Sequence, residues 1–448
     1  MTQTPSSLLL VGSGPLPSEK RNGGNAGGLR TEQFLRSIPE GFDVSIFVVE
    51  NEEYKGIKTK KEVRQLRHVS VSRHDPNIFR HLRQFYWRNS PTCVVGVNFF
   101  PCYLASCQIP KHVPFWADMN GWAMAEKQAQ AFALQTNDYI PLAKKMEKEI
   151  LVRADKVSVV SKAQKYAVYG EMAMIGLLTK DSFRHPFVEV IENSCRPLSS
   201  EEALAEKYFR GRVCPEDAII AVWIGGMNAW ADEKTLFEAC ELVMAKVSNF
   251  YFFMTGTDLL GIDEESYPRF QKRVKKSRFH DRFHLLGWIP YEHVPSLLRE
   301  ADMGINVDRM CAETEVGARN RINEMLRYEL PIVTTMGSEI AEIVGQSGAG
   351  LTCESGESRE IANAIEKLCQ DKNLQKRCIV AGQTLIKTRF SDTLLQRDFC
   401  AWLKNPTHSP KAMLKKKGVF SVGLSYLRHR GIRAFWGRVL REVYSRFS

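Results

Sequence analysis

Residues 219–255 read IIAVWIGGMNAWADEKTLFEACELVMAKVSNFYFFMT. An apolar run, Ile219–Ile224, leads into a Gly-Gly turn, and a helical pattern over Glu233–Val247 precedes a second apolar run, Phe250–Thr255. Short runs that are almost continuously apolar are typical of parallel strands covered on both faces. The stretch therefore predicts a strand–helix–strand unit of an α/β protein.

The same alternation extends along most of the chain. Outside the opening stretch, the sequence predicts strands at Leu8–Gly12, Asp43–Val49, Cys93–Asn98, Val113–Asp118, Lys156–Ser161, Val188–Glu192, Phe283–Leu286, Met303–Val307, Pro331–Thr334 and Gly350–Cys353. It predicts further helices at Leu29–Ile38, Val294–Ala301 and Ser358–Gln370. Repeated βαβ units predict doubly wound parallel sheets.

The alternation is interrupted once, between Arg196 and Asp217, in a charged stretch with two prolines. We expect two Rossmann-like domains, residues 1–200 and 216–385, that face each other across a cleft. A helix within residues 386–404 follows, and we expect it to cross back and pack on the first domain. Residues 411–448 form a basic amphipathic tail.

Composition narrows the class of protein. The chain has 448 residues, of which 44% are hydrophobic and 25% are charged, as in ordinary globular proteins. Its apolar runs are too short to span a bilayer, and the first residues lack the basic region of a signal peptide. The eleven cysteines form no C-x-x-C pair, so we expect reduced cytoplasmic thiols and no structural zinc.

The positive charge is concentrated at the C-terminus. The net charge is +11, and residues 411–448 hold ten Lys/Arg against one Glu, which leaves +2 on the rest. Apolar residues recur there at three- and four-residue intervals with arginines between them, a pattern typical of helices that lie on anionic membranes. In the alternative, this stripe packs on the protein's own first domain. Nucleic-acid binding has support only from the tail, and we expect none.

In each domain, a glycine-containing turn follows the first predicted strand. Gly27 and Gly28 precede a helix that we expect to open near Leu29, and Gly225 and Gly226 end the strand of the opening stretch. Glycine lets the backbone approach a ligand, and a helix N-terminus favours phosphate. In the alternative, the first turn is a loop without a ligand and Trp230, beside the second, is a core aromatic.

Residues 311–344 read CAETEVGARNRINEMLRYELPIVTTMGSEIAEIV. Helical spacing puts Arg319 in a first turn and Glu324 in the next. An arginine in a first turn opposes the helix dipole, which is understandable if it grips a phosphate. A carboxylate one turn later could hold sugar hydroxyls. The alternative is a solvated face of charged side chains.

Taken in order, these motifs resemble the GT-B glycosyltransferases, and most closely the family-4-type enzymes of O-antigen and polysaccharide biosynthesis. The matching stretches are Gly27-Gly28-Leu29-Arg30, the G-G-x-x-x-W-x-D-x-x-T-L turn from Gly225 to Leu236, Glu313-Thr314 followed by Arg319, Arg321 and Glu324, and GWIPYEHVPSLLREADMGINV. Leu330–Thr335 matches the family's G-x-P-V-V-A-T strand.

The resemblance implies transfer of a sugar from a nucleotide-diphosphate donor to a saccharide or lipid-linked acceptor, with retention and with neither a metal nor a cofactor. It implies that the second domain binds the nucleotide and the first lies on the acceptor side. It also implies roles for individual residues. Arg319 and Arg321 would neutralise the diphosphate, Glu324 would hold the ribose, Gly27, Gly28, Arg30, Gly225, Gly226 and Trp230 would line the donor site, and Asp118 would face the sugar and acceptor.

One departure concerns the family's E-x7-E pair. The first Glu would fall at position 316, which is Val316, so Glu313 or Glu315 would contact the donor sugar instead. The missing Glu keeps open a catalytically silent GT-B-like binding or assembly protein. Asp118 has its own alternative, as a turn or helix-capping residue. For an active enzyme we expect a cytoplasmic protein that is peripheral on the inner face of the membrane.

Overall fold

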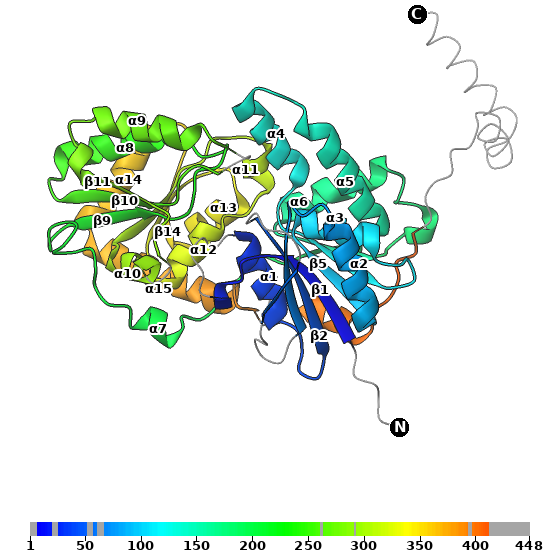
Figure 1. The fold of residues 1–448 in the computed structure, drawn as a ribbon. Coiled ribbons are helices and arrows are strands. Elements are labelled where there is room, and N and C mark those ends of the chain that lie inside the picture. Colours follow the sequence, from blue (N-terminus) through cyan, green and yellow to red (C-terminus); the bar gives the residue numbers. More distant parts are fainter. Residues whose placement is uncertain are drawn as a thin grey trace, which may run out of the picture. The chain divides into compact units, whose positions relative to one another are not determined.

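The computed structural model describes residues 7–19, 26–51, 57–60, 67–259, 263–290, 293–392 and 397–411. The chain divides into two compact units, and one of them, residues 1–171 with 186–409, holds both sheets of the protein (Figure 1). The other unit comprises residues 172–185 and 410–448. Residues 412–448, which make up most of the predicted basic tail, lie outside the described residues.

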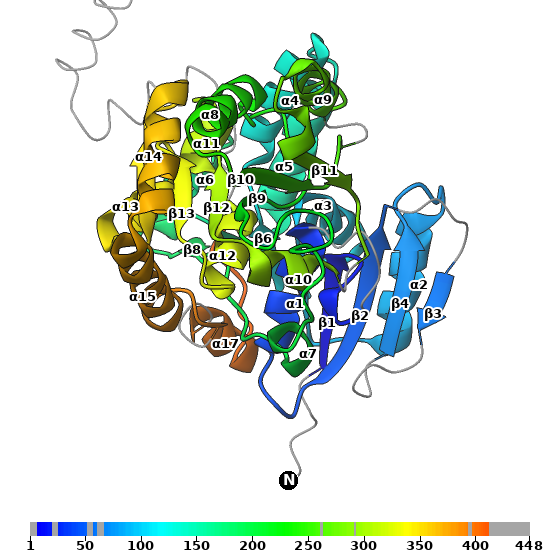
Figure 2. The same ribbon diagram turned by 90° about the vertical axis from the view of Figure 1, so that its left-hand side faces the viewer.

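The first sheet has eight strands in the order β3-β4-β2-β1-β5-β6-β7-β8. Their bounds are β1 Ser7–Ser13, β2 Asp43–Glu50, β3 Ile57–Lys60, β4 Arg67–Ser72, β5 Cys93–Val97, β6 Phe115–Met119, β7 Lys156–Val159 and β8 Val188–Val190. All neighbours are parallel except β3, which pairs antiparallel with β4 at the edge (Figure 2). The sequence did not predict β3 or β4.

The second sheet is wholly parallel, in the order β11-β10-β9-β12-β13-β14. Its strands are β9 Ile219–Trp223, β10 Phe250–Thr255, β11 Phe283–Gly287, β12 Met303–Asn306, β13 Ile332–Thr335 and β14 Gly350–Cys353. All six were predicted to within two residues at each end. Most of their side chains are buried because helices cover both faces, which explains the nearly continuous apolar runs.

Helices connect most of the strands in both sheets. They are α1 Ala26–Arg36, α2 Ile78–Asn89, α3 Phe99–Gln108, α4 Ala123–Leu134, α5 Tyr139–Arg153, α6 Lys162–Met174, α7 Ser200–Ala203, α8 Glu233–Lys246, α9 Ser266–Lys276, α10 His293–Glu300, α11 Ala312–Val316, α12 Asn320–Arg327, α13 Glu339–Ser347, α14 Ser358–Gln370, α15 Lys372–Thr388 and α17 Arg397–Lys404. Single 3-10 turns lie at Pro17–Glu19, Lys180–Ser182 and His280–Arg282. Within the described part of the chain, no helix is long and apolar enough to cross a membrane.

Helix α17 belongs to the core of the first sheet, although it follows the second in sequence. Phe399 contacts Phe34 and Trp116 edge-on, with ring centroids 4.9 and 5.3 Å apart, and Trp402 also packs on Trp116. Helix α17, which lies within the segment predicted to cross back, thus packs on side chains of α1 and β6.

Polar contacts join the two sheet-bearing halves. Ser161 Oγ, after β7, donates to the Val316 carbonyl at 2.6 Å, and the backbone N–H of Lys162 donates to Glu339 at 2.7 Å. Arg389 forms ion pairs with both Glu192 and Glu339. The C-terminal ends of β7 and β13 are thereby held near each other.

Candidate functional site

In open parallel sheets, ligands bind beyond the carboxyl ends of the strands. The turns after β1, β5 and β6 lie at that edge of the first sheet, and those after β9, β12 and β13 lie at that edge of the second. Most of the predicted site residues fall in these turns or in the helices that follow them. These side chains differ in how many of their polar atoms already form hydrogen bonds or ion pairs within the protein.

Helix α1 begins at Ala26, three residues earlier than predicted, so Gly27 and Gly28 lie in its first turn. Gly28 is buried and Gly27 is partly exposed. The Gly27 carbonyl accepts hydrogen bonds from Thr31 and from Asn98 Nδ2. The turn ahead of these glycines lies outside the described residues.

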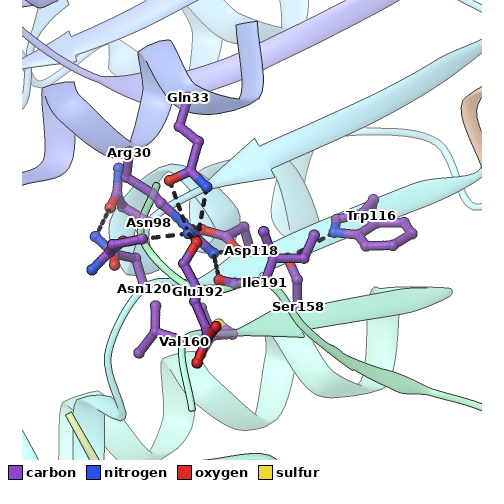
Figure 3. Close-up of polar contacts among 12 residues, drawn as sticks. Arg30, Gln33, Asn98, Trp116, Asp118, Asn120, Ser158, Val160, Ile191 and Glu192 are labelled. Atoms are coloured by element: carbon purple, nitrogen blue, oxygen red, sulfur yellow. Dashed lines mark hydrogen bonds and ion pairs between the residues drawn. The ribbon is translucent and has the colours of Figure 1, made fainter. Parts of the chain in front are cut away.

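Arg30 is 1% exposed and lies at the centre of a buried polar network (Figure 3). Its Nε and Nη2 bind the two carboxylate oxygens of Asp118 at 2.9 and 2.7 Å. The guanidinium also donates to the carbonyls of Ile191 and Glu192 and to Gln33. A bidentate ion pair with this many supporting bonds fixes α1, β6 and the segment after β8 against each other.

Asp118 has no exposed surface and accepts a third hydrogen bond from Ser158 Oγ, at 2.6 Å. The sequence placed Asp118 and Arg30 facing a ligand. The structure turns both side chains inward, because a charge at the centre of a sheet must be paired. Neither the turn nor the helix-cap alternative for Asp118 holds, since it is a residue of β6.

Two asparagines at the same edge were not singled out from the sequence. Asn98, between β5 and α3, has φ +76° and ψ +158°, a conformation that costs a residue other than glycine about 1–3 kcal/mol. Its Oδ1 accepts a hydrogen bond from Asn120 Nδ2 at 3.0 Å, and both residues are partly exposed (Figure 3). No motif marks such strain in a sequence, since it depends on the fold.

In the second sheet, β9 ends in the predicted turn. Gly225 has φ +81°, which favours glycine. A Cβ on Gly226 would lie 2.7 Å from the Thr257 carbonyl oxygen, so this residue must lack a side chain. Trp230, a few residues later, is partly exposed, and the Arg319 guanidinium lies 5.6 Å from its ring centroid.

Arg319 is 4% exposed and precedes α12, which begins at Asn320. Its Nε binds Asp308 at 2.5 Å, and Nη1 and Nη2 bind the two oxygens of Glu313 at 3.0 and 2.7 Å. Burial acts to lower the pKa of Arg319, but Asp308 and Glu313 more than offset this and raise it. The predicted phosphate contact is thus already occupied by carboxylates, and Arg319 positions α11 against α12.

Arg321 differs from Arg319 because its guanidinium is only partly hydrogen-bonded by the described residues. Its Nη2 donates to the Gly226 carbonyl at 2.9 Å, and its guanidinium stacks 3.8 Å above the Trp223 ring. Nη1 is buried and has no hydrogen-bond partner among the described residues. Burial lowers the pKa of Arg321 to about 10, with Arg319 adding to the effect and Asp308 opposing it. An unpaired cationic nitrogen beside a glycine turn is suited to bind an anion.

The acidic residues of this region fall into three environments. Glu313 is buried against Arg319, and burial raises its pKa although Arg319 opposes this. Glu315 is exposed. Glu324 is partly exposed, one turn of α12 beyond Arg321, and pairs with Arg327 at 2.5 Å.

Residues 218–371 match the family model of the group 1 glycosyl transferases. We refer to these matched residues as the group 1 domain; they include the second sheet, the Gly225–Gly226 turn, Arg319 and Arg321. No curated protein matches the chain.

Solved structures resemble almost the whole chain. Sucrose-phosphate synthase from Thermosynechococcus elongatus is 12% identical, with a TM-score of 0.62, over 89% of this chain and 98% of that one. An E. coli trehalose-6-phosphate protein bound with UDP-2-fluoro glucose is 10% identical, with a TM-score of 0.64, over 90% and 100%. Anabaena HepE in complex with UDP and glucose is 13% identical, with a TM-score of 0.60, over 90% and 100%.

These likenesses show the GT-B fold, and the predicted fold class is confirmed. Sucrose- and trehalose-phosphate synthases are among the structures that match, so the likenesses do not single out the O-antigen enzymes that the sequence motifs resemble.

Proposed function

We propose that this protein transfers a glycosyl group from a nucleotide-diphosphate sugar to a saccharide or lipid-linked saccharide acceptor. The observation that carries the proposal is the buried Nη1 of Arg321, which lacks a hydrogen-bond partner among the described residues and belongs to a side chain that contacts the Gly225–Gly226 turn of the group 1 domain. A diphosphate oxygen placed there would receive a charge-assisted hydrogen bond, and this bond would strengthen as the leaving group gains charge.

We assign the roles of the other site residues from the hydrogen bonds and ion pairs that each already forms within the protein. Arg319 and Arg30 act as positioning residues, with Asp118 and Glu313 as their partners. The partly exposed Glu324 is proposed to hold ribose hydroxyls, and the exposed Glu315 to approach the donor sugar. Gly27, Gly28 and Trp230 are proposed to line the donor site from either side.

Retention of configuration is part of the proposal, as is a place in polysaccharide biosynthesis. Among the similar structures is a trehalose-6-phosphate synthase studied for glycosyltransfer with retention, which supports the stereochemical assignment. Sugar-donor and acceptor complexes among these structures support binding of both classes of substrate.

The proposal is tested by measuring nucleotide release and product formation with a panel of UDP- and GDP-sugars and saccharide acceptors. Calorimetry with UDP and GDP runs in parallel. Turnover with at least one donor, together with binding of its nucleotide, is the expected result. Nucleotide binding without turnover or hydrolysis of any donor would instead identify a catalytically silent binding protein.

Docking on an anionic membrane surface through residues 411–448 is a separate part of the proposal. Each basic residue near such a surface contributes about 1 kcal/mol. The full chain is compared with a chain ending at Pro410 by flotation with liposomes of rising anionic lipid content. We expect only the full chain to float at low salt. If neither version floats, the membrane assignment fails.

A further inference from the structure

Glu126 lies in the first turn of α4, just after the carboxyl end of β6. Helix α4 packs beside α11 of the group 1 domain (Figure 1). The residue is therefore on the first domain but next to the segment that carries Glu313. It was not singled out from the sequence, where no motif surrounds it.

The Glu126 carboxylate is partly exposed and receives no hydrogen bond from any described residue. It lies directly over Gly121, where an added Cβ would be 2.1 Å from Glu126 Oε1. Gly121 also has φ +111°, so glycine is favoured there on two grounds. The carboxylate is thus held in place by packing, while its hydrogen-bonding capacity is left unused.

Charged groups from the second domain and from helices α4 and α5 act on this carboxylate. Glu313 and Arg319 belong to the second domain, where α11 packs beside α4, Lys127 is the next residue on α4, and the buried Glu147 belongs to α5. Burial is the largest effect and Glu313 the next, and they raise the pKa of Glu126 to about 7 against the opposing effect of Lys127 and Arg319. Glu126 and Glu313 therefore repel each other when both are ionised.

We propose that Glu126 binds a hydroxyl group of the donor's sugar, from the side opposite the group 1 domain. A sugar hydroxyl beside Glu126 would donate a hydrogen bond to this carboxylate and so offset its repulsion by the buried Glu313. This inference rests on the proposed function, and it adds a residue of the first domain to sugar recognition.

The consequence is a link between sugar binding and proton release. A hydroxyl that donates to Glu126 favours its ionised form, so binding lowers the pKa of this group and releases a proton near neutral pH. The nucleoside diphosphate alone lacks the sugar and does not produce this effect.

The test compares calorimetric binding of UDP with UDP-glucose, UDP with UDP-N-acetylglucosamine, and GDP with GDP-mannose. In Glu126→Gln we expect the affinity for the sugar nucleotide to fall about tenfold relative to its nucleoside diphosphate, since one charge-assisted hydrogen bond is weakened. Affinity for the nucleoside diphosphate stays within about twofold. Glu149→Gln, an exposed change on α5, serves as the matched control and alters neither.

Repeating the titrations at pH 7 in phosphate and in Tris measures the proton released. For the wild type we expect about half a proton more with the sugar nucleotide than with its nucleoside diphosphate, and no difference in Glu126→Gln. An unchanged affinity ratio in Glu126→Gln, or equal proton release by the variant and the wild type, overturns the inference. If the wild type binds none of these nucleoside diphosphates, the proposed function itself fails and the inference falls with it.

Discussion

The carboxyl edges of the two sheets each carry a buried arginine held by carboxylates, and that of the second sheet also carries Arg321, whose buried Nη1 has no hydrogen-bond partner among the described residues. At the first sheet, Arg30 is fully engaged by Asp118, Gln33 and backbone carbonyls. At the second, Arg319 is engaged in the same way, while Arg321 leaves Nη1 without a partner among the described residues.

The difference separates charges that hold the fold from a charge that is available to a ligand. A buried ion pair repays its desolvation only when its hydrogen bonds are complete, as they are for Arg30 and Arg319. Arg321 is desolvated without that compensation, which explains why its pKa falls while that of Arg319 rises. Incomplete pairing at the edge of a sheet is therefore the better indicator of a binding residue.

The largest expected effect is on stability. Arg30→Met and Arg319→Met should each lower the free energy of unfolding by about 3–5 kcal/mol, because each leaves a buried carboxylate without its partner. Urea unfolding of the two variants and the wild type measures this. The paired variant Arg30→Met with Asp118→Leu should recover much of the loss. A cost below about 1 kcal/mol for Arg30→Met would contradict its role in the fold.

A second prediction concerns the loss of folding stability at low pH. Glu202 accepts hydrogen bonds from Arg196 and Ser199 and pairs with Arg327. Burial alone would raise its pKa, but these partners lower it to about 2 from 4.5. Its stabilisation is complete above about pH 4.5 and is lost as the pH falls toward 2. Each pKa unit corresponds to 1.36 kcal/mol, so about 3 kcal/mol is at stake.

The measurement is the pH dependence of the unfolding free energy between pH 2.5 and pH 6. Glu202→Gln should flatten this dependence, whereas Glu206→Gln, an exposed change nearby, should leave it as in the wild type. Equal slopes in the wild type and Glu202→Gln would show that Glu202 is not responsible.

The smallest expected effect has the opposite sign. Glu147 is buried, and neither carboxylate oxygen has a hydrogen-bond partner among the described residues. Burial and the neighbouring Glu171 raise its pKa well above the ordinary value. Its contribution to stability is present at low pH and is lost as the pH rises through the raised pKa. Glu147→Gln should therefore be more stable than the wild type at pH 8 by about 1 kcal/mol or more.

At about pH 3, below the ordinary pKa of 4.5, that advantage should disappear, because the wild-type carboxyl is then protonated in both the folded and the unfolded state. Thermal melting of the two proteins at both pH values tests this. A destabilised Glu147→Gln variant at pH 8 would argue that the carboxylate is ionised and bound.

Much of the fold could be predicted because its strands are covered on both faces. Buried parallel strands such as β9 and β10 read as apolar runs, and glycine turns mark where they end. The edge strand β3 and its neighbour β4 were not predicted, since IKTK and RHVSVS alternate polar with apolar residues and are too short to stand out.

The sequence indicated a candidate site, but it could not indicate which of its side chains are already paired within the protein. Motif spacing brought Arg319 and Arg321 to one helix start, yet their different pairing depends on Asp308 and on the Gly226 carbonyl, which only the fold brings close. Asn98 and Glu126 were missed for the same reason. Strain and unused hydrogen-bonding capacity are properties of tertiary structure.

The most direct test of the account is calorimetric binding of UDP and GDP to the wild type, Arg321→Met and Lys234→Met. Lys234 is an exposed cation on α8, paired with Glu238, and serves as the control. Loss of one charge-assisted hydrogen bond, worth about 1.5–3 kcal/mol, should weaken nucleotide binding by Arg321→Met about 10- to 100-fold. Its unfolding midpoint should stay at or above that of the wild type, and Lys234→Met should bind as the wild type does. Equal affinity of Arg321→Met and the wild type for the nucleotide that binds would contradict the assignment of Arg321 to the diphosphate.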